Sequence, residues 1–231
     1  MLDITPSLLP RKAKSLYRKP RQERSRIRFE AILDAAADLL ETMEPEEVSI
    51  YTLSEKADIS PTSIYHFFPD ANWAFVALAE RYYEYFLKGL EQPITFEFNT
   101  WQDLQSARFE DAQAFFNENG AARRLLLGSG LSIDIRLRDL EIDRVLAQKT
   151  VDQWCHYFVM PEIPKLVDRI TEMMIMSDAL WSLSVHRWGY ITDEMAEQAG
   201  RARIAYGRTF LPEYLPLRTK PELPVVKPQR E

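Results

Sequence analysis

Cysteine, glycine and long apolar runs are all scarce in this sequence. One cysteine, Cys155, among 231 residues cannot form a disulfide within the chain, and the 3 histidines do not join it in a zinc-ligand spacing. No apolar run approaches the ~18 residues of a membrane span, and the start "MLDITPSLLPRK" has too short an apolar run for a secretion signal. The composition therefore favours a soluble cytoplasmic protein with no metal, no cofactor and no membrane partner.

The shortage of glycine also bears on the fold class. Only 7 glycines interrupt a chain that is 46% hydrophobic and rich in Ala, Leu, Glu and Arg, which lose little freedom in a helix. Apolar residues recur at three- and four-residue steps over 24–43 and 163–188. We predict an all-α fold, with further helices over 50–57, from Pro61 to just before Pro69, and over 71–87, 100–116, 139–160 and 193–210.

Charge is distributed unevenly along the chain. Residues 1–30 carry nine Lys or Arg against three acidic residues, a net charge of +6, which leaves −12 for the remainder of a chain whose total is −6. A basic end on an acidic body is expected when one end meets a polyanion. A solvated basic tail is the alternative that charge alone leaves open.

The stretch "ADISPTSIYHFF", residues 57–68, mixes hydroxyls with aromatic side chains. Asp58 is placed for a tight turn, and Ser60 followed by Pro61 is typical of a helix start. On a helical wheel, Pro61, Ile64 and Phe68 share the inner face, while Thr62, Tyr65 and His66 point away. A short capped helix after a turn is a helix-turn-helix pattern, and exposed donors on its first turns suit a DNA groove.

The order of these motifs is similar to the DNA-binding domain of the TetR family of bacterial transcriptional regulators. The resemblance covers about the first third of the chain and is carried by "ILDAAADLLE", "VSIYTLSEKADIS" and "SIYHFFPDANWAF". It implies a helix-turn-helix reader, a larger helical domain that binds an effector and dimerises, and no enzymatic activity. The expected divisions are a basic arm (1–22), the helix-turn-helix domain (23–69), the effector and dimerisation domain (70–211) and a Pro-rich tail (212–231), expected to be unstructured.

The same resemblance implies the residues that contact DNA. The candidate base and phosphate contacts are Arg21, Arg24, Arg26, Thr52, Ser60, Thr62, Ser63, Tyr65, His66 and Asn72. Three positions depart from the family pattern: Asp58 and Thr62 stand where the family usually has Gly, and Ala71 replaces a Lys that anchors a phosphate. Backbone N–H groups at Asn72 and Trp73 are the expected substitute for that Lys.

The remaining candidates concern the effector and the dimer. Aromatic, Met and Arg residues at helical spacing are the expected pocket lining, although such residues usually form ordinary core: Phe115, Phe116, Arg123, Arg124, Trp154, His156, Tyr157, Met174 and Trp181. The expected homodimer interface, a four-helix arrangement of the last two helices, uses Ile170, Met173, Leu180, Val185 and Ile204.

The resemblance thus implies a ligand-responsive repressor that binds a palindromic double-stranded DNA operator as a homodimer and is released by a small hydrophobic or aromatic effector. One alternative is an all-α enzyme or small-molecule carrier without DNA function. It lacks support, because the sequence has no Gly-rich phosphate loop, nucleophile motif or cluster of carboxylates with His. Another alternative keeps the DNA-binding fold but binds a protein partner in place of an effector.

Overall fold

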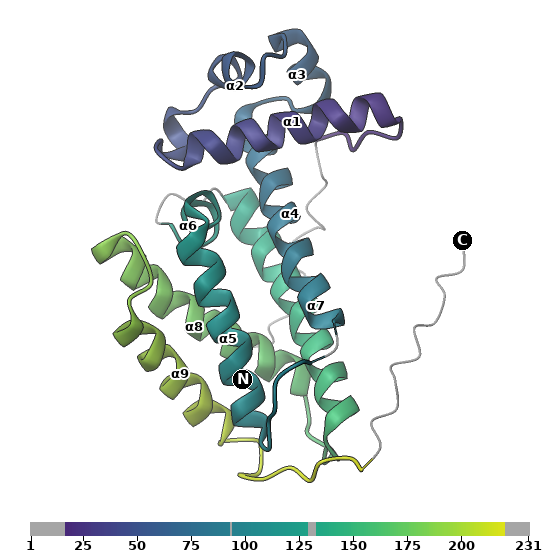
Figure 1. The fold of residues 1–231 in the computed structure, drawn as a ribbon, viewed down its shortest axis with the longest axis vertical. Helices are drawn as coiled ribbons and strands as arrows, with labels where there is room; N and C mark the ends of the chain where they lie inside the picture. Colours follow the sequence, from purple (N-terminus) through teal and green to yellow (C-terminus); the bar gives the residue numbers. More distant parts are fainter. Residues whose placement is uncertain (1–16, 93, 129–132, 220–231) are drawn as a thin grey trace, which may run out of the picture.

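The computed structural model describes residues 17–92, 94–128 and 133–219, and this part of the chain is helical (Figure 1). Within these ranges no β-strand forms, and one antiparallel bridge pairs Phe158 with Leu217. The all-α prediction is confirmed. The helices are α1 (Glu23–Leu40), a 3₁₀ turn (Pro45–Glu47), α2 (Ile50–Ala57), α3 (Pro61–Phe67), α4 (Ala71–Glu91), α5 (Trp101–Glu118), α6 (Gly120–Leu127), α7 (Ile133–Tyr157), α8 (Leu166–Trp188) and α9 (Asp193–Gly207).

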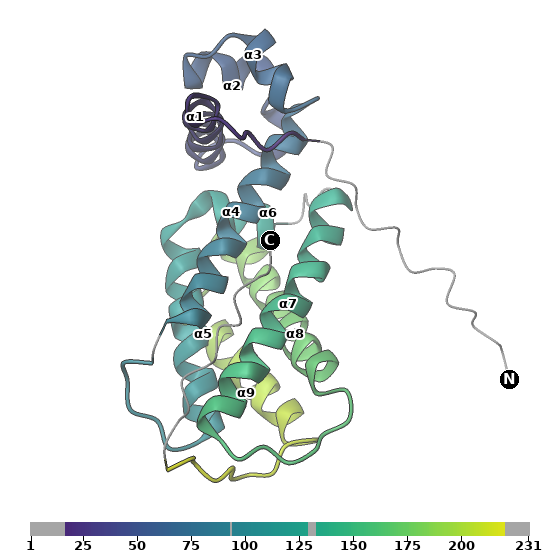
Figure 2. The same ribbon diagram turned by 90° about the vertical axis from the view of Figure 1, so that its right-hand side faces the viewer.

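Two bodies are connected by one long helix. Helices α1, α2 and α3 form a small head at one end, and α5 to α9 form an elongated bundle at the other (Figures 1 and 2). Helix α4 begins in the head and runs down into the bundle, where it packs beside α7. Helix α4 therefore belongs to both the head and the bundle.

Side-chain caps fix where the helices start, as the sequence predicts. Ser49, Ser60, Asp70, Thr100 and Thr192 each accept a hydrogen bond from the backbone N–H three residues later, which satisfies a group that the helix leaves unpaired. In the turn between α2 and α3, Asp58 adopts the expected left-handed backbone, with φ 53°.

Some helix ends differ from the prediction. Helix α4 continues to Glu91, because Gly89 is accommodated inside the helix at a cost of about 1 kcal/mol and does not end it. Helix α7 begins at Ile133, six residues before the predicted start at Asp139, and ends at Tyr157. Helix α8 begins only at Leu166, after Pro164 and a left-handed Lys165.

The described part of the Pro-rich segment after α9 is packed, against the expectation of an unstructured tail. Leu211 and Leu215 are buried in the lower core of the bundle with Trp101 and Trp154. The Trp101 indole also donates a hydrogen bond to the Pro212 carbonyl. Proline prevents a helix here, but apolar side chains between the prolines still anchor the segment; residues 220–231 of the predicted tail lie outside the described residues, as do residues 1–16 of the predicted arm.

None of the helices in the described ranges combines the length and the apolar character needed to cross a lipid bilayer.

Candidate DNA-binding surface and effector pocket

The outward face of α3 carries polar side chains. Thr62 and His66 are exposed, and half of the Tyr65 side-chain surface is open to solvent. Ile64 and Phe68 lie fully buried on the opposite side, so the predicted division of this helix into an inner and an outer face is confirmed. The exposed set contains an imidazole and two hydroxyls, which are donors and acceptors of the size that base edges and phosphates accept.

A buried aromatic cluster holds α3 from behind. Phe29 of α1 contacts both Phe67 and Phe68, with ring centroids 5.7 and 5.1 Å apart, and the Tyr17 ring packs on Phe29 and Phe68 at 6.0 and 5.9 Å. The Arg18 backbone N–H donates to the Phe67 carbonyl at 3.0 Å. Residues just before α1 are thus fixed against α3, and this explains why the stretch 57–68 ends in two phenylalanines.

The hydroxyls predicted to contact phosphates also cap the helices. Ser60 and Ser63 oxygens lie 2.9 Å apart, and Thr52 shares a 2.9 Å contact with the Ser49 hydroxyl. A hydroxyl has one donor and two acceptor sites, so each of these groups keeps capacity for a further hydrogen bond.

Basic side chains lie exposed in front of and along the start of α1. They are Arg18, Lys19, Arg21, Arg24, Arg26 and Arg28. Of the three predicted contacts among them, Arg26 forms an ion pair with Glu23, whereas Arg21 and Arg24 are exposed. The acids further along α1 are paired with basic side chains of other helices at the surface: Arg81 pairs with Glu30 and Asp34, and Lys56 pairs with Asp38. The basic character of this end is therefore retained.

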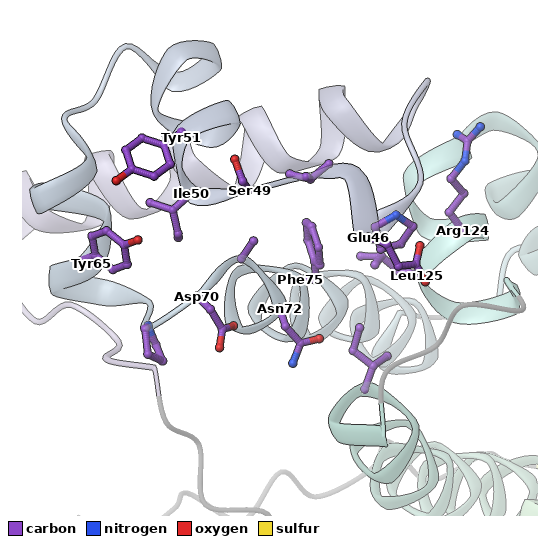
Figure 3. A pocket seen from close by; sticks show the side chains of 15 residues that line it. Glu46, Ser49, Ile50, Tyr51, Tyr65, Asp70, Asn72, Phe75, Arg124 and Leu125 are labelled. Atoms are coloured by element: carbon purple, nitrogen blue, oxygen red, sulfur yellow. The ribbon is translucent and has the colours of Figure 1, made fainter.

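Helix α4 starts at the cleft between the head and the bundle (Figure 3). The Asn72 side chain points toward the bundle and donates to Asp134 at the start of α7, 3.2 Å away. The Trp73 N–H is capped by Asp70 at 3.2 Å, so the expected phosphate contact through Trp73 is wrong. Of the two backbone N–H groups that we expected to bind a phosphate at this helix start, the one at Asn72 stays a prediction.

Tyr51 lies at the first turn of α2 and lines the same cleft as Tyr65 (Figure 3). Its side chain is 64% exposed. Our sequence reasoning missed it, although its position next to the buried Ile50 on an otherwise polar face was a signal. With Thr52 and Tyr65, it adds a third hydroxyl to this part of the head.

The bundle contains a partly open cavity of about 1030 Å³, lined by α4, α5, α6, α7 and α8. Five of the nine predicted lining residues lie in its wall: Phe115, Phe116, Trp154, Met174 and Trp181. The aromatic rings contact one another, with Tyr85 stacked on Phe115 at 4.6 Å and Phe86 edge-on at 4.8 Å. A cavity of this size and lining suits a small molecule with an aromatic or apolar body.

The other four predicted lining residues lie elsewhere. Arg123 donates to the Phe116 and Asn117 carbonyls, and Arg124 pairs with Glu44 and donates to the Leu40 carbonyl, so both cations stabilise the contact of α6 with its neighbours. Tyr157 packs edge-on against Phe98 at 5.2 Å, and His156 stacks edge-on against Tyr157 at the end of α7. Helical spacing alone did not show that these residues point away from the cavity.

Three carboxyl groups that sequence reasoning missed line the cavity: Asp139 and Asp143, one turn apart on α7, and Asp178 on α8. Tyr83 of α4 donates to Asp139 at 2.6 Å, and Arg136 donates to the same carboxylate at 2.7 Å. Burial, followed by repulsion from Asp139, raises the pKa of Asp143 to about 7. The four-residue spacing in "DLEID" was the available signal, because it places both acids on one helix face together with Ile135.

A second polar network joins the head to the bundle. Glu80 of α4, which is buried, accepts hydrogen bonds from Tyr17 and from Arg138 of α7 and pairs with Lys19 at 2.9 Å. These partners, through their hydrogen bonds and charges, hold the pKa of Glu80 below its usual value although burial opposes the shift. The basic segment before α1 is therefore tied to the same two helices that form the cavity wall.

Two of the predicted dimer contacts are wrong. Ile170 and Met173 are fully buried in the lower core of their own chain, with Trp101 and Trp154, so they cannot meet a second copy. Leu180, Val185 and Ile204 are partly buried against the core of the same chain. The exposed side of α8 includes the apolar residues Met176, Ala179 and Leu183, with Glu172 before them and His186 and Arg187 after them.

The arrangement as a whole is that of TetR-family transcriptional regulators, and the chain has their fold. A TetR-family regulator from Streptomyces coelicolor superimposes with a TM-score of 0.63 at 19% identity, over 81% of this chain and 99% of the other. A second, from Rhodococcus sp. RHA1, gives a TM-score of 0.62 at 16% identity, over 80% and 97%. SmeT, the repressor of the Stenotrophomonas maltophilia multidrug efflux pump SmeDEF, gives 0.56 at 13% identity, over 85% and 95%.

Neither a family model nor a curated protein sequence matches this chain.

Proposed function

We propose that the chain is a TetR-type regulator of transcription, a homodimer that binds an operator through α3 and is a repressor released when a small molecule occupies the cavity. The observation that carries the proposal is the exposed set Thr62, Tyr65 and His66 on a short helix that a buried aromatic cluster holds in place. The exposed basic residues before and along the start of α1 supply the charge that phosphate binding needs.

The dimer is assigned to the exposed stripe of α8. Met176, Ala179 and Leu183 recur at three- and four-residue steps, so they form one apolar face that a second copy would cover around a twofold axis. Such a dimer would present two α3 helices together, and successive major grooves on one side of a duplex lie about 34–36 Å apart.

Titrating the protein with duplex DNA from around its own gene, followed by fluorescence anisotropy at several salt concentrations, tests this function. We expect affinity well above that for a random duplex and a steep fall as salt rises, because each phosphate contact releases counterions. Equal affinity for both duplexes would contradict the proposal and favour a small-molecule carrier.

A further inference from the structure

The cavity holds an acid whose charge the protein does not balance. Asp143 is only 5% exposed, lines the cavity, and its Oδ2 atom has no hydrogen-bond partner among the described residues. Asp178 lines the same cavity from α8, and burial together with Asp143 and Asp139 raises its pKa well above the usual value.

The two cations that act on these acids already have other partners. Arg136 is committed to Asp139, and the Arg203 guanidinium lies 3.2 Å from the centroid of the Phe109 ring and donates to the Ser177 hydroxyl at 3.4 Å. Three carboxyl groups thus lie beside two guanidinium groups, and neither of these cations donates a hydrogen bond to Asp143 Oδ2. A buried carboxylate without a partner is costly, so a ligand cation would stabilise it.

Unpaired polar groups from other helices point to a ligand independently of the acids. Gln105 Nε2 of α5 and Trp181 Nε1 of α8 are buried cavity-lining donors without a partner among the described residues. Arg108 Nε and Nη2 on the cavity wall share this property. The cavity therefore offers acceptors on α7 and α8 and separate donors on α5 and α8.

We propose that this cavity binds a protonated organic amine with an aromatic body, its nitrogen at Asp143 and Asp178 and its ring against Phe115, Phe116 and Trp181. A ligand oxygen would accept hydrogen bonds from Gln105 or Trp181. Aromatic faces attract cations as well as apolar rings, so both parts of such a molecule find partners here. The amine's role as an effector rests on the proposed function, whereas its binding does not.

Three matched probes test the charge that the cavity prefers: naphthylethylamine, naphthylethanol and naphthylacetate, titrated into the full chain by calorimetry at pH 8. We expect the amine to bind at least tenfold more tightly than the neutral alcohol, and the acetate most weakly. Equal affinities for the amine and the alcohol would overturn the inference. Tighter binding of the acetate would do the same and would assign the site to Arg108.

Variants of the two acids test where the amine nitrogen binds. Asp143→Asn and Asp178→Asn should each weaken amine binding at least fivefold and leave naphthylethanol within twofold, with circular dichroism confirming the fold. Asp152→Asn is the matched control on the same helix, because this acid lies exposed and accepts a hydrogen bond from Gln148. Unchanged amine affinity in both cavity variants counts against the site.

A pH series on the unaltered chain keeps the test decisive if the variants misfold. Because Asp143 takes up a proton below pH 7, amine affinity should fall about tenfold from pH 8 to pH 6, while the alcohol binds equally at both. The titratable and charged groups that face this acid include Asp139 and Arg136 of α7, Asp178 of α8 and Tyr83 of α4. A pH-independent amine affinity would overturn the assignment.

The two proposals fail separately. A chain that binds its DNA but shows no preference for the amine overturns only the ligand class. A chain that binds the amine but not DNA overturns only the regulatory function.

Discussion

Tyr83 of α4 donates a 2.6 Å hydrogen bond to Asp139 of α7. One partner belongs to the helix that carries the head, and the other belongs to the acidic wall of the cavity. The acidic wall of the cavity therefore contacts α4 directly, without an intervening loop. Asn72 and Glu80 add two further contacts between the same helices, with Asp134 and Arg138.

Replacing Tyr83 with Phe should lower the free energy of unfolding by about 1–2 kcal/mol, because a buried carboxylate loses one of its two donors. Urea denaturation followed by circular dichroism measures the change. Tyr85→Phe is the matched control, because Tyr85 lies on the same helix and is exposed. An unfolding curve for Tyr83→Phe that overlays the control would show that the hydrogen bond contributes no stability.

Asp143→Asn should stabilise the chain at pH 8 and have little effect at pH 4. The folded pKa is about 7 against an ordinary value of 3.8, so the unfolded chain releases this proton first and stability falls as pH rises from about 4 to 7. Removing the acid removes that loss, which we expect to be worth up to about 4 kcal/mol at pH 8. Melting temperatures at the two pH values test this, and an equal difference at both would argue against it.

Thr62→Ala and Tyr65→Phe should separate sequence reading from phosphate binding. Loss of the Tyr65 hydroxyl removes a phosphate hydrogen bond and should weaken binding to all duplexes alike, by about 1 kcal/mol. Loss of the Thr62 hydroxyl should change the preference among operator variants by about 1–3 kcal/mol at one base pair. Anisotropy with a panel of duplexes distinguishes these effects, and Tyr190→Phe, equally exposed on the bundle, is the control. The same uniform change in both head variants would refute the assigned roles.

Two glycine substitutions test the packing of the bundle. A Cβ at Gly207 would lie 2.7 Å from the buried Trp101 ring, so Gly207→Ala should cost about 1–3 kcal/mol. At Gly89, inside α4, a Cβ would meet no atom within 4 Å, so Gly89→Ala should stabilise the chain by up to about 1 kcal/mol. Thermal melting compares the pair, and a stable Gly207→Ala variant would mean that Trp101 moves freely.

Local chemistry explains which parts could be predicted from the sequence. A cap needs one side chain and one N–H three residues away, so Ser60 and Asp70 could be assigned without knowing the rest of the fold. The outward direction of Thr62 follows in the same way from the short period of a helix.

The cavity and the dimer face depend on contacts between helices, which no single segment specifies. Ile170 and Met173 lie on a broad apolar stripe, and the sequence does not say which edge of that stripe packs inside its own chain. In the sequence, Asp139 and Asp143 look like ordinary surface charges. Only the packing of α7 against α8 shows that they line the same cavity as Asp178.

The continuity of α4 has a mechanical consequence. Its 21 residues span about 30 Å as an unbroken rod, so a tilt of about 5° at the cavity end would displace the head by about 3 Å. In the proposed homodimer, opposite tilts would double this change in the separation of the two α3 helices. A molecule that shifts one helix by a few degrees would thereby move both out of register with grooves whose spacing is fixed by the duplex.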